Sequence, residues 1–337
     1  MRILIPFVVL GSLFAAYSAF WLYLSHAVKG QVAESQKRWS SEGIHVTHRN
    51  LSVEGFPYRL TLKARGVQVS QQDGRFDWSW EAPFLYATAH PWQLSHWVVN
   101  LESSSELSLT LDAEFLLRAI VGSGRISFIG DADGFPIRAS FDLENMVLQS
   151  DQFYQQIDVG GIEVHVRRLE DTNAGVDVAI LVNEVYLGDG NVHYLDASIQ
   201  GIVAEMSLKE PLPDSWDRLA LAEWRDDGGV VELPHFRVVW GALDLQLDGT
   251  FSLDEAFRPI GAANVAVKGY QSLLEVLLFE GAISESVAVA VGLGLDILAE
   301  PIPEEDVRLL KAPVTIQDGY LSVGGIPLVP VGPIFPP

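Results

Sequence analysis

The sequence predicts a mainly β protein. We expect an elongated or curved antiparallel sheet built from repeated β units, with an N-terminal transmembrane helix and a few short covering helices. Three observations lead to this fold class: an apolar stretch over residues 3–24, alternation of apolar and polar residues after residue 39, and turn signals between the alternating runs. Alternation with a period of two places the apolar side chains on one face of a strand. With 337 residues, of which 48% are hydrophobic, the chain can bury a large core.

The apolar stretch is long enough to cross a membrane. At about 1.5 Å per residue, a helix over residues 3–24 spans about 33 Å, and Trp21 and Tyr23 near its end suit the membrane interface. A cleaved signal peptide is the alternative, although its apolar region is usually only about 7–15 residues long and no convincing small-x-small cleavage site follows the apolar stretch before His26. We therefore expect an uncleaved anchor, with a juxtamembrane helix completing residues 1–39.

The charges set limits on partners and topology. The net charge is −22 and there is no cysteine, so the sequence argues against nucleic-acid binding and rules out disulfides and thiol chemistry. Only Arg2 precedes the apolar stretch, whereas Lys29, Lys37 and Arg38 follow it. Counted by the positive-inside rule alone, these charges would place the body in the cytoplasm. Residues 26–39 are also suited to lie along the membrane surface as an amphipathic continuation.

Residues 40–324 form the β-rich body, with candidate sub-units 40–125 and 126–324. Alternating runs predict strands at residues 60–64, 107–111, 176–182 and 243–247. Predicted turns lie at Asp73-Gly74, Gly188-Asp189-Gly190-Asn191, Asp248-Gly249 and Asp318-Gly319. Short helices are expected at residues 113–120, 215–224, 272–279 and 286–298. Gly122-Ser123-Gly124 is interpreted as a connection between helix and strand, and residues 325–337 as a Pro/Gly-rich extended tail.

Two sets of residues are candidates for contact with a ligand on an apolar face. Gly55-Phe56-Pro57-Tyr58-Arg59 recurs as Gly134-Phe135-Pro136-Ile137-Arg138, which indicates either a repeated strand-entry corner or a ligand contact. Four tryptophans fall within twenty residues, as a sheet core or as an aromatic rim beside an apolar cleft or the bilayer. The candidate contacts are Phe56, Arg59, Trp78, Trp80, Trp92, Trp97, Phe135 and Arg138.

The sequence indicates no catalytic residue, metal site or cofactor. His45 and His48 are three apart in a strand-like region, so their side chains would face opposite sides. No His-Glu-x-x-His run and no Gly-x-Ser-x-Gly elbow occurs. A hydrolase would have to join His90 or His193 to distant carboxylates, and we expect that the protein is not an enzyme.

Short motifs in a fixed order carry a family resemblance. The N-terminal anchor precedes three of them: residues 53–59, Ala82-Pro83 and His90-Pro91-Trp92. With Asp318-Gly319-Tyr320-Leu321 and Gly325-Ile326-Pro327-Leu328, they resemble the DUF2125 proteins of alphaproteobacteria over nearly the whole chain. That resemblance implies a single-pass protein of the inner membrane with its body in the periplasm, and no known activity. Residues 249–267 also look like repeats in AsmA-type envelope proteins, which implies a groove concerned with envelope lipid.

Two functions follow as hypotheses. The first is a membrane-anchored protein that binds or handles lipid or another hydrophobic ligand in envelope biogenesis, because the apolar face of a long sheet must be covered by something. The alternative is a non-catalytic scaffold that holds an envelope protein through its sheet edges or acidic face.

Overall fold

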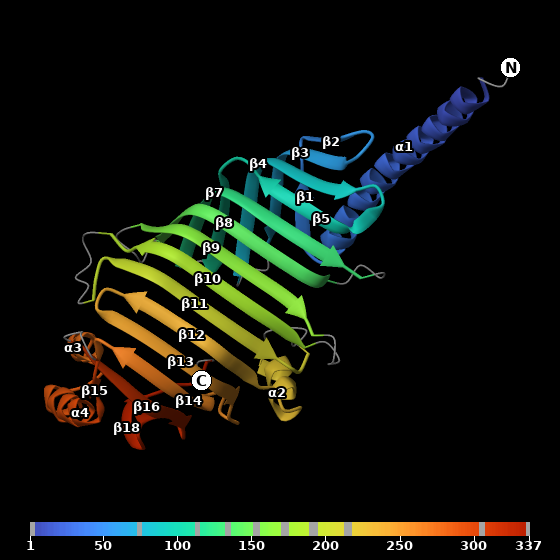
Figure 1. Ribbon diagram of the computed structural model, residues 1–337. Helices are drawn as coiled ribbons and strands as arrows, with labels where there is room; N and C mark the ends of the chain where they lie inside the picture. Colours follow the sequence, from blue (N-terminus) through green and yellow to red (C-terminus); the bar gives the residue numbers. More distant parts are fainter. Residues whose placement is uncertain are drawn as a thin grey trace. The chain divides into compact units, whose positions relative to one another are not determined.

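The computed structural model shows a mainly β chain, as the sequence predicts (Figure 1). It describes residues 4–72, 76–111, 115–131, 136–150, 156–169, 175–188, 195–211, 218–302 and 307–334. Eighteen strands belong to one antiparallel sheet. The helices are α1 (Leu4–Ser41), α2 (Arg218–Asp226), α3 (Tyr270–Phe279) and α4 (Glu285–Leu298).

The chain divides into two compact units, residues 1–156 and 157–337. The predicted boundary between residues 125 and 126 lies within a strand, β7. Unit 1 contains α1 and the strands β1 (Ile44–Thr47), β2 (Asn50–Glu54), β3 (Leu60–Gln71), β4 (Phe76–His90), β5 (Gln93–Leu101), β6 (Ser105–Leu111), β7 (Phe115–Gly130) and β8 (Pro136–Ser150). Unit 2 contains the other helices and the strands β9 (Ile157–Arg168), β10 (Val176–Tyr186), β11 (Ser198–Leu208), β12 (Val231–Trp240), β13 (Leu243–Leu253), β14 (Pro259–Lys268), β15 (Glu300–Pro301), β16 (Arg308–Gln317), β17 (Tyr320–Val323) and β18 (Ile326–Pro330).

In unit 1, short strands lie end to end between long ones. The strands β1 and β2 both pair with β3, and β3 pairs with β4. The other edge of β4 is shared by β5 and β6, which both pair with β7, and β7 pairs with β8. The interruption between β5 and β6 leaves a gap in one row of the sheet, and side chains of the neighbouring strands line it.

Unit 2 is a meander in which each strand from β9 to β14 pairs with the next along the chain. The strand β16 then pairs with β14, and β17 and β18 follow it as a hairpin. The helices α3 and α4 enter between β14 and β16, and they pack together over the ends of β13 and β16.

The register of unit 2 aligns apolar side chains into a continuous row on one face. Directly paired residues of antiparallel strands share a face. One such row, from β9 to β16, consists of Ile162, Val182, Ile202, Val238, Leu245, Val267 and Leu310. The adjacent row consists of Val164, Ile180, Ala204, Phe236, Leu247, Val265 and Ala312. We call these fourteen residues the apolar face.

Side chains alternate between the two faces of a strand. This alternation shifts by one residue at two positions, where a glycine lies opposite a residue with a left-handed backbone conformation. Gly122 in β7 lies opposite Asn145 in β8, whose φ is +54°, and Gly160 in β9 lies opposite Glu184 in β10, whose φ is +53°. An added Cβ at Gly122 would lie 3.0 Å from the Asn145 Cβ, so the glycine provides the space for this crossing. Before Gly122 the odd positions of β7 are buried, at Ala119 and Val121, whereas after it the odd position Arg125 is exposed.

Two predictions for this strand are wrong. Residues 115–120, expected to lie in a short helix over 113–120, belong to β7, and residues 112–114 lie outside the described part of the chain. Leu116, Leu117, Ala119 and Ile120 imitate a helical period, although they lie on both faces of a strand. Gly122-Ser123-Gly124 is the interior of the same strand and does not connect a helix to it.

Other local predictions have mixed outcomes. Asp248-Gly249 was expected to form a turn but lies inside β13, where Asp248 pairs with Asn264. The Asp318-Gly319 turn is confirmed between β16 and β17, whereas Asp73-Gly74 and residues 189–191 lie outside the described residues. The helices expected over 272–279 and 286–298 are confirmed as α3 and α4, and α2 covers part of 215–224. The expected extended tail includes β18, which pairs with β17.

The face opposite the apolar one is held by ion pairs between neighbouring strands. The Arg237 guanidinium donates two hydrogen bonds of 2.9 Å to the Asp244 carboxylate, from β12 to β13. These bonds lower the pKa of Asp244. The Arg167 guanidinium pairs in the same way with Asp177 at 2.6 Å, from β9 to β10.

We expect Asp244→Asn to lower the free energy of unfolding by about 0.5–1 kcal/mol at neutral pH. Because the folded pKa of Asp244 is depressed, this stabilisation is present above the unfolded pKa of about 3.9 and is lost as the pH falls through the folded pKa. Denaturant unfolding of the detergent-solubilised protein at several pH values measures it. The matched control is Asp248→Asn on the same face of β13, where the Asp248 carboxylate accepts from Asn264 Nδ2 at 3.0 Å. A deficit in Asp244→Asn that grows in acid would contradict the assignment.

Candidate functional site

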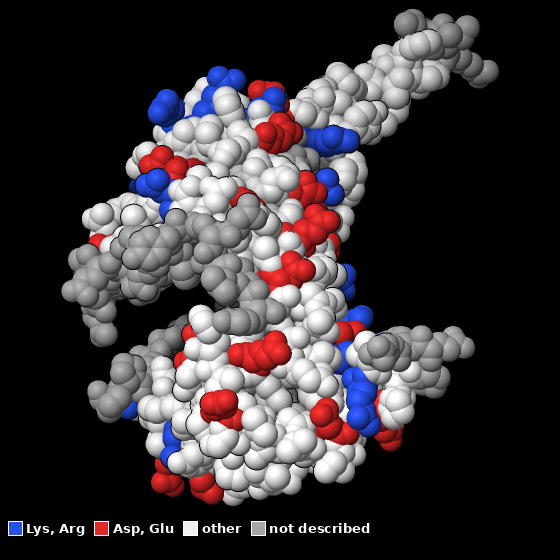
Figure 2. Space-filling model, turned by 90° about the vertical axis from the view of Figure 1, so that its left-hand side faces the viewer, with Lys and Arg blue, Asp and Glu red and all other residues white. Residues whose placement is uncertain are grey.

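The long helix α1 packs on the sheet through one short segment. Trp21, Leu24 and Val28 are buried, and Trp21 and Leu24 form a cluster with Leu60, which is 0% exposed at the start of β3. The large apolar side chains of α1 before this segment are exposed; Leu10, for example, is 67% exposed. No Lys, Arg, Asp or Glu occurs between Arg2 and Lys29, and Figure 2 shows the projecting part of α1 free of charged side chains. By length and composition, α1 is consistent with a membrane anchor or a signal sequence.

The motif of residues 55–59, the loop between β2 and β3, contacts α1. The Phe56 ring packs edge-on against Phe14 and Trp21, at centroid distances of 6.0 and 5.6 Å. Trp21 Nε1 donates to the Arg59 carbonyl at 2.9 Å, and the Tyr17 hydroxyl donates to the Pro57 carbonyl. The sequence prediction of a ligand or core role for Phe56 and Arg59 missed these helix partners. Aromatic residues at positions 14, 17 and 21, spaced to share one side of a helix, were the available signal.

A second aromatic element lies beside this motif. The His90 ring stacks on Trp92 at 5.0 Å, and His90 Nδ1 lies 3.2 Å from the Tyr58 carbonyl. Tyr58 is 70% exposed and Trp92 is 64% exposed. These contacts join the turn between β4 and β5 to residues 55–58, which we call the motif loop.

The other candidate residues do not join this group. Trp78 and Trp80 share a face of β4, opposite Leu109 and Leu107, about 30 Å along the strand from His90. Trp97 donates from Nε1 to the Leu94 carbonyl at 2.8 Å. Phe135 lies outside the described residues, and Arg138 is exposed in β8 opposite Ile129. The four tryptophans therefore do not line one site.

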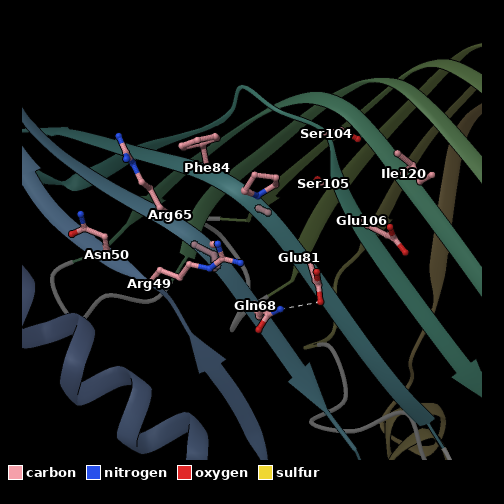
Figure 3. Close-up of a pocket in the computed structure, with 14 residues that line it drawn as sticks. Arg49, Asn50, Arg65, Gln68, Glu81, Phe84, Ser104, Ser105, Glu106 and Ile120 are labelled. Atoms are coloured by element: carbon pink, nitrogen blue, oxygen red, sulfur yellow. Dashed lines mark hydrogen bonds between the residues drawn. The ribbon is translucent and has the colours of Figure 1, made fainter.

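A polar groove of about 700 Å³ crosses β3 and β4 in unit 1, from the start of β2 at Asn50 to the start of β6 at Ser105 (Figure 3). Arg49, Arg65 and Phe84 lie at one side, and the Arg65 guanidinium lies 5.6 Å from the centre of the Phe84 ring. Gly66, with φ of +56°, leaves room for Arg49, since a Cβ there would lie 2.9 Å from Arg49 Nε. No local sequence pattern predicted this groove, because it depends on the pairing of β6 with β4.

Two guanidinium groups and one carboxylate, that of Glu81, line the groove without an ion pair to the described residues. The Glu81 carboxylate accepts from Gln68 at 3.1 Å, and the Glu106 carboxylate pairs with Arg118 at 2.8 Å. Arg49 and Arg65 form no ion pair with the described residues. Ser105 is 2% exposed and its hydroxyl has no hydrogen-bond partner in the described part of the chain. The groove can thus offer two guanidinium groups and a hydroxyl to a small anion or polar group.

Among the described residues of unit 2, α3 and α4 cover one end of the apolar face. Leu243, Val267 and Leu310 are buried beneath α3 and α4, together with Tyr270 and Ala299. The phenol of Tyr270 donates to the Asp296 carboxylate, and burial followed by this contact raises the pKa of Tyr270. The apolar side chains of β9 to β12 are half-buried rather than buried: Ile162, Val164, Ile180, Val182, Ile202, Ala204, Phe236 and Val238.

The histidines do not gather into a metal site. Within the described ranges, no group of three or more His, Asp or Glu side chains could hold a metal ion. His45 is exposed in β1, and His193 lies outside the described residues.

The geometry defines a class of protein: a large antiparallel sheet with a polar and an apolar face, joined at one edge to a long apolar N-terminal helix. The family model described as "Uncharacterized protein conserved in bacteria (DUF2125)" matches residues 21–332. The chain belongs to the DUF2125 family, which confirms the resemblance seen in the sequence. No curated protein and no solved structure matches the chain. The looser resemblance to AsmA-type repeats stays a prediction.

We expect Leu60→Ala to lower the free energy of unfolding by about 2–5 kcal/mol, because it opens a cavity between α1 and the sheet. Thermal unfolding in detergent measures the effect. The control is Leu94→Ala in β5, where Leu94 is 39% exposed and the expected change is within about 0.5 kcal/mol. Equal losses in the two variants would show that α1 is not packed on β3.

Proposed function

We propose that this protein is an uncleaved, single-pass protein of the inner membrane whose periplasmic body binds a lipid or another hydrophobic ligand on the apolar face. It acts by binding rather than by catalysis. The half-buried rows of apolar side chains on β9 to β12 carry the proposal.

Packing of α1 supports an uncleaved helix. Removal of the apolar segment would take away Trp21 and Leu24 and would expose Leu60 to water. The helix continues without a break to Ser41, and the family match begins at Trp21. A segment that contributes buried residues to the folded body is unsuited to removal.

The periplasmic orientation rests on the family resemblance, since Lys29, Lys37 and Arg38 follow the apolar part of α1. A phosphatase that is active only outside the cytoplasm, fused after Trp39, should therefore be active in cells. The same position fused to a reporter that is active only in the cytoplasm should be inactive. The reverse pattern would overturn the orientation and leave the anchor intact.

The binding of a hydrophobe is supported by the half-buried state of the apolar side chains on β9 to β12 in the described part of the chain. Each buried CH₂ of an acyl chain contributes about 0.8 kcal/mol, so a row of apolar side chains across several strands can hold such a chain without a charged partner. The helices α3 and α4 close the face at β13, β14 and β16, and a ligand on β9 to β12 would continue this apolar layer.

We expect the detergent-extracted protein to retain lipid in native mass spectrometry. Val238→Asn, which places an amide on the apolar face, should reduce the bound lipid several-fold. Val239→Asn is the matched control, because Val239 is the next residue of β12, is also half-buried and lies on the opposite face. Reproducible absence of lipid from the wild-type protein would overturn the proposal. Equal retention by the two variants would place the ligand elsewhere.

A further inference from the structure

We propose that the motif loop, residues 55–58, together with Trp92, is immersed in the lipid leaflet beside α1. This inference rests on the proposed membrane anchor and adds a second membrane-contacting element to it.

The first argument is a length. A hydrocarbon core about 30 Å thick needs about 20 helical residues, so a span that begins at Leu4 ends near Tyr23. Phe56 contacts Phe14 and Trp21, which lie about 14 Å and 3 Å before Tyr23 along the helix. If the loop stayed outside the core, the uncharged stretch between Arg2 and Phe14, about 18 Å long as a helix, would be too short to cross it. The loop must therefore lie at the same depth in the membrane as the last turns of the membrane-spanning part of α1.

The second argument is the hydrogen bonding of the loop. A backbone carbonyl in hydrocarbon requires a protein partner, because water is absent. The Gly55 carbonyl accepts from the Arg59 amide at 2.9 Å, and the Pro57, Tyr58 and Arg59 carbonyls accept from Tyr17, His90 and Trp21. Pro57 has no amide hydrogen to satisfy. The same bonds satisfy the polar atoms of Tyr17 and Trp21 on the helix.

The folded-back conformation of the loop depends on Gly55. Gly55 has φ of +101°, and an added Cβ would lie 2.9 Å from the Arg59 carbonyl oxygen. Glycine is therefore required for the loop to fold back on itself.

The third argument is the side chains that the loop leaves uncovered. Phe56, Tyr58 and Trp92 are 43%, 70% and 64% exposed. Three large aromatic rings next to an apolar helix are costly in water and favourable at the boundary between acyl chains and headgroups. The exposed Arg59 lies at the level of Trp21, where a guanidinium can reach lipid phosphates.

Single-cysteine spin labels test this inference, and the chain has no native cysteine to remove. The full-length protein carries the label at Tyr58→Cys or Trp92→Cys and is reconstituted in phosphatidylethanolamine–phosphatidylglycerol vesicles. Power saturation compares collisions with oxygen, which partitions into lipid, and with a water-soluble nickel complex. Leu10→Cys, in the exposed apolar part of α1, is the lipid reference, and Glu42→Cys, just beyond the end of α1, is the aqueous reference.

We expect the ratio of oxygen to nickel accessibility at positions 58 and 92 to exceed that at position 42 several-fold and to approach that at position 10. Labels at 58 and 92 that match position 42, while position 10 remains in lipid, would overturn the immersed loop and leave the anchor standing. An aqueous label at position 10 would overturn the anchor and the immersed loop together. The Tyr58 and Trp92 side chains are mostly exposed, so neither substitution removes a core contact.

Discussion

The cross-strand register is the constraint on which the body of this protein depends. In unit 2 the paired backbones bring Val182, Ile202 and Val238 onto one face and leave Asp177, Arg237 and Asp244 on the other. A shift of one residue in any strand would move its apolar side chains to the polar face. The ion pairs on the polar face and the helices over β13 and β16 both require the same register, so they reinforce it. The division of the sheet into an apolar and a polar face therefore depends on the register of all its strands together.

Unit 1 adds a constraint that comes from the helix. The start of β3 is buried by α1 through Leu60, and the loop before β3 gives its carbonyl groups to Tyr17 and Trp21. Because these donors belong to the helix, its orientation against β2 and β3 is fixed by hydrogen bonds as well as by apolar contact. Tyr17 and Trp21 thus pack against the unit and also donate hydrogen bonds to carbonyl groups of the loop beside the apolar helix.

Much of this fold could be predicted from the sequence. The length and composition of the apolar helix, and alternation at residues 60–64, 107–111, 176–182 and 243–247, predicted the elements that form. Prediction failed in β7, because apolar residues at adjacent positions such as Leu116 and Leu117 lie on both faces of the strand and resemble a helical pattern. It failed at Asp248-Gly249 because strand pairing overrides a local turn preference. For the candidate site, Phe56 and Arg59 were identified without their partners on α1, and the groove at Ser105 depends on pairing that no local pattern shows.

If the protein is anchored and binds lipid as we propose, the packing of α1 on Leu60 has a consequence for how it meets that ligand. A body held at a fixed height above a bilayer searches for lipid by lateral diffusion in two dimensions, and its effective concentration at the membrane does not depend on its concentration in the compartment. Extraction of a lipid then competes with a neighbouring bilayer that is always in reach, so a modest affinity is sufficient and rapid exchange is favoured. The helix contact therefore sets the kinetic regime of the protein as well as its location.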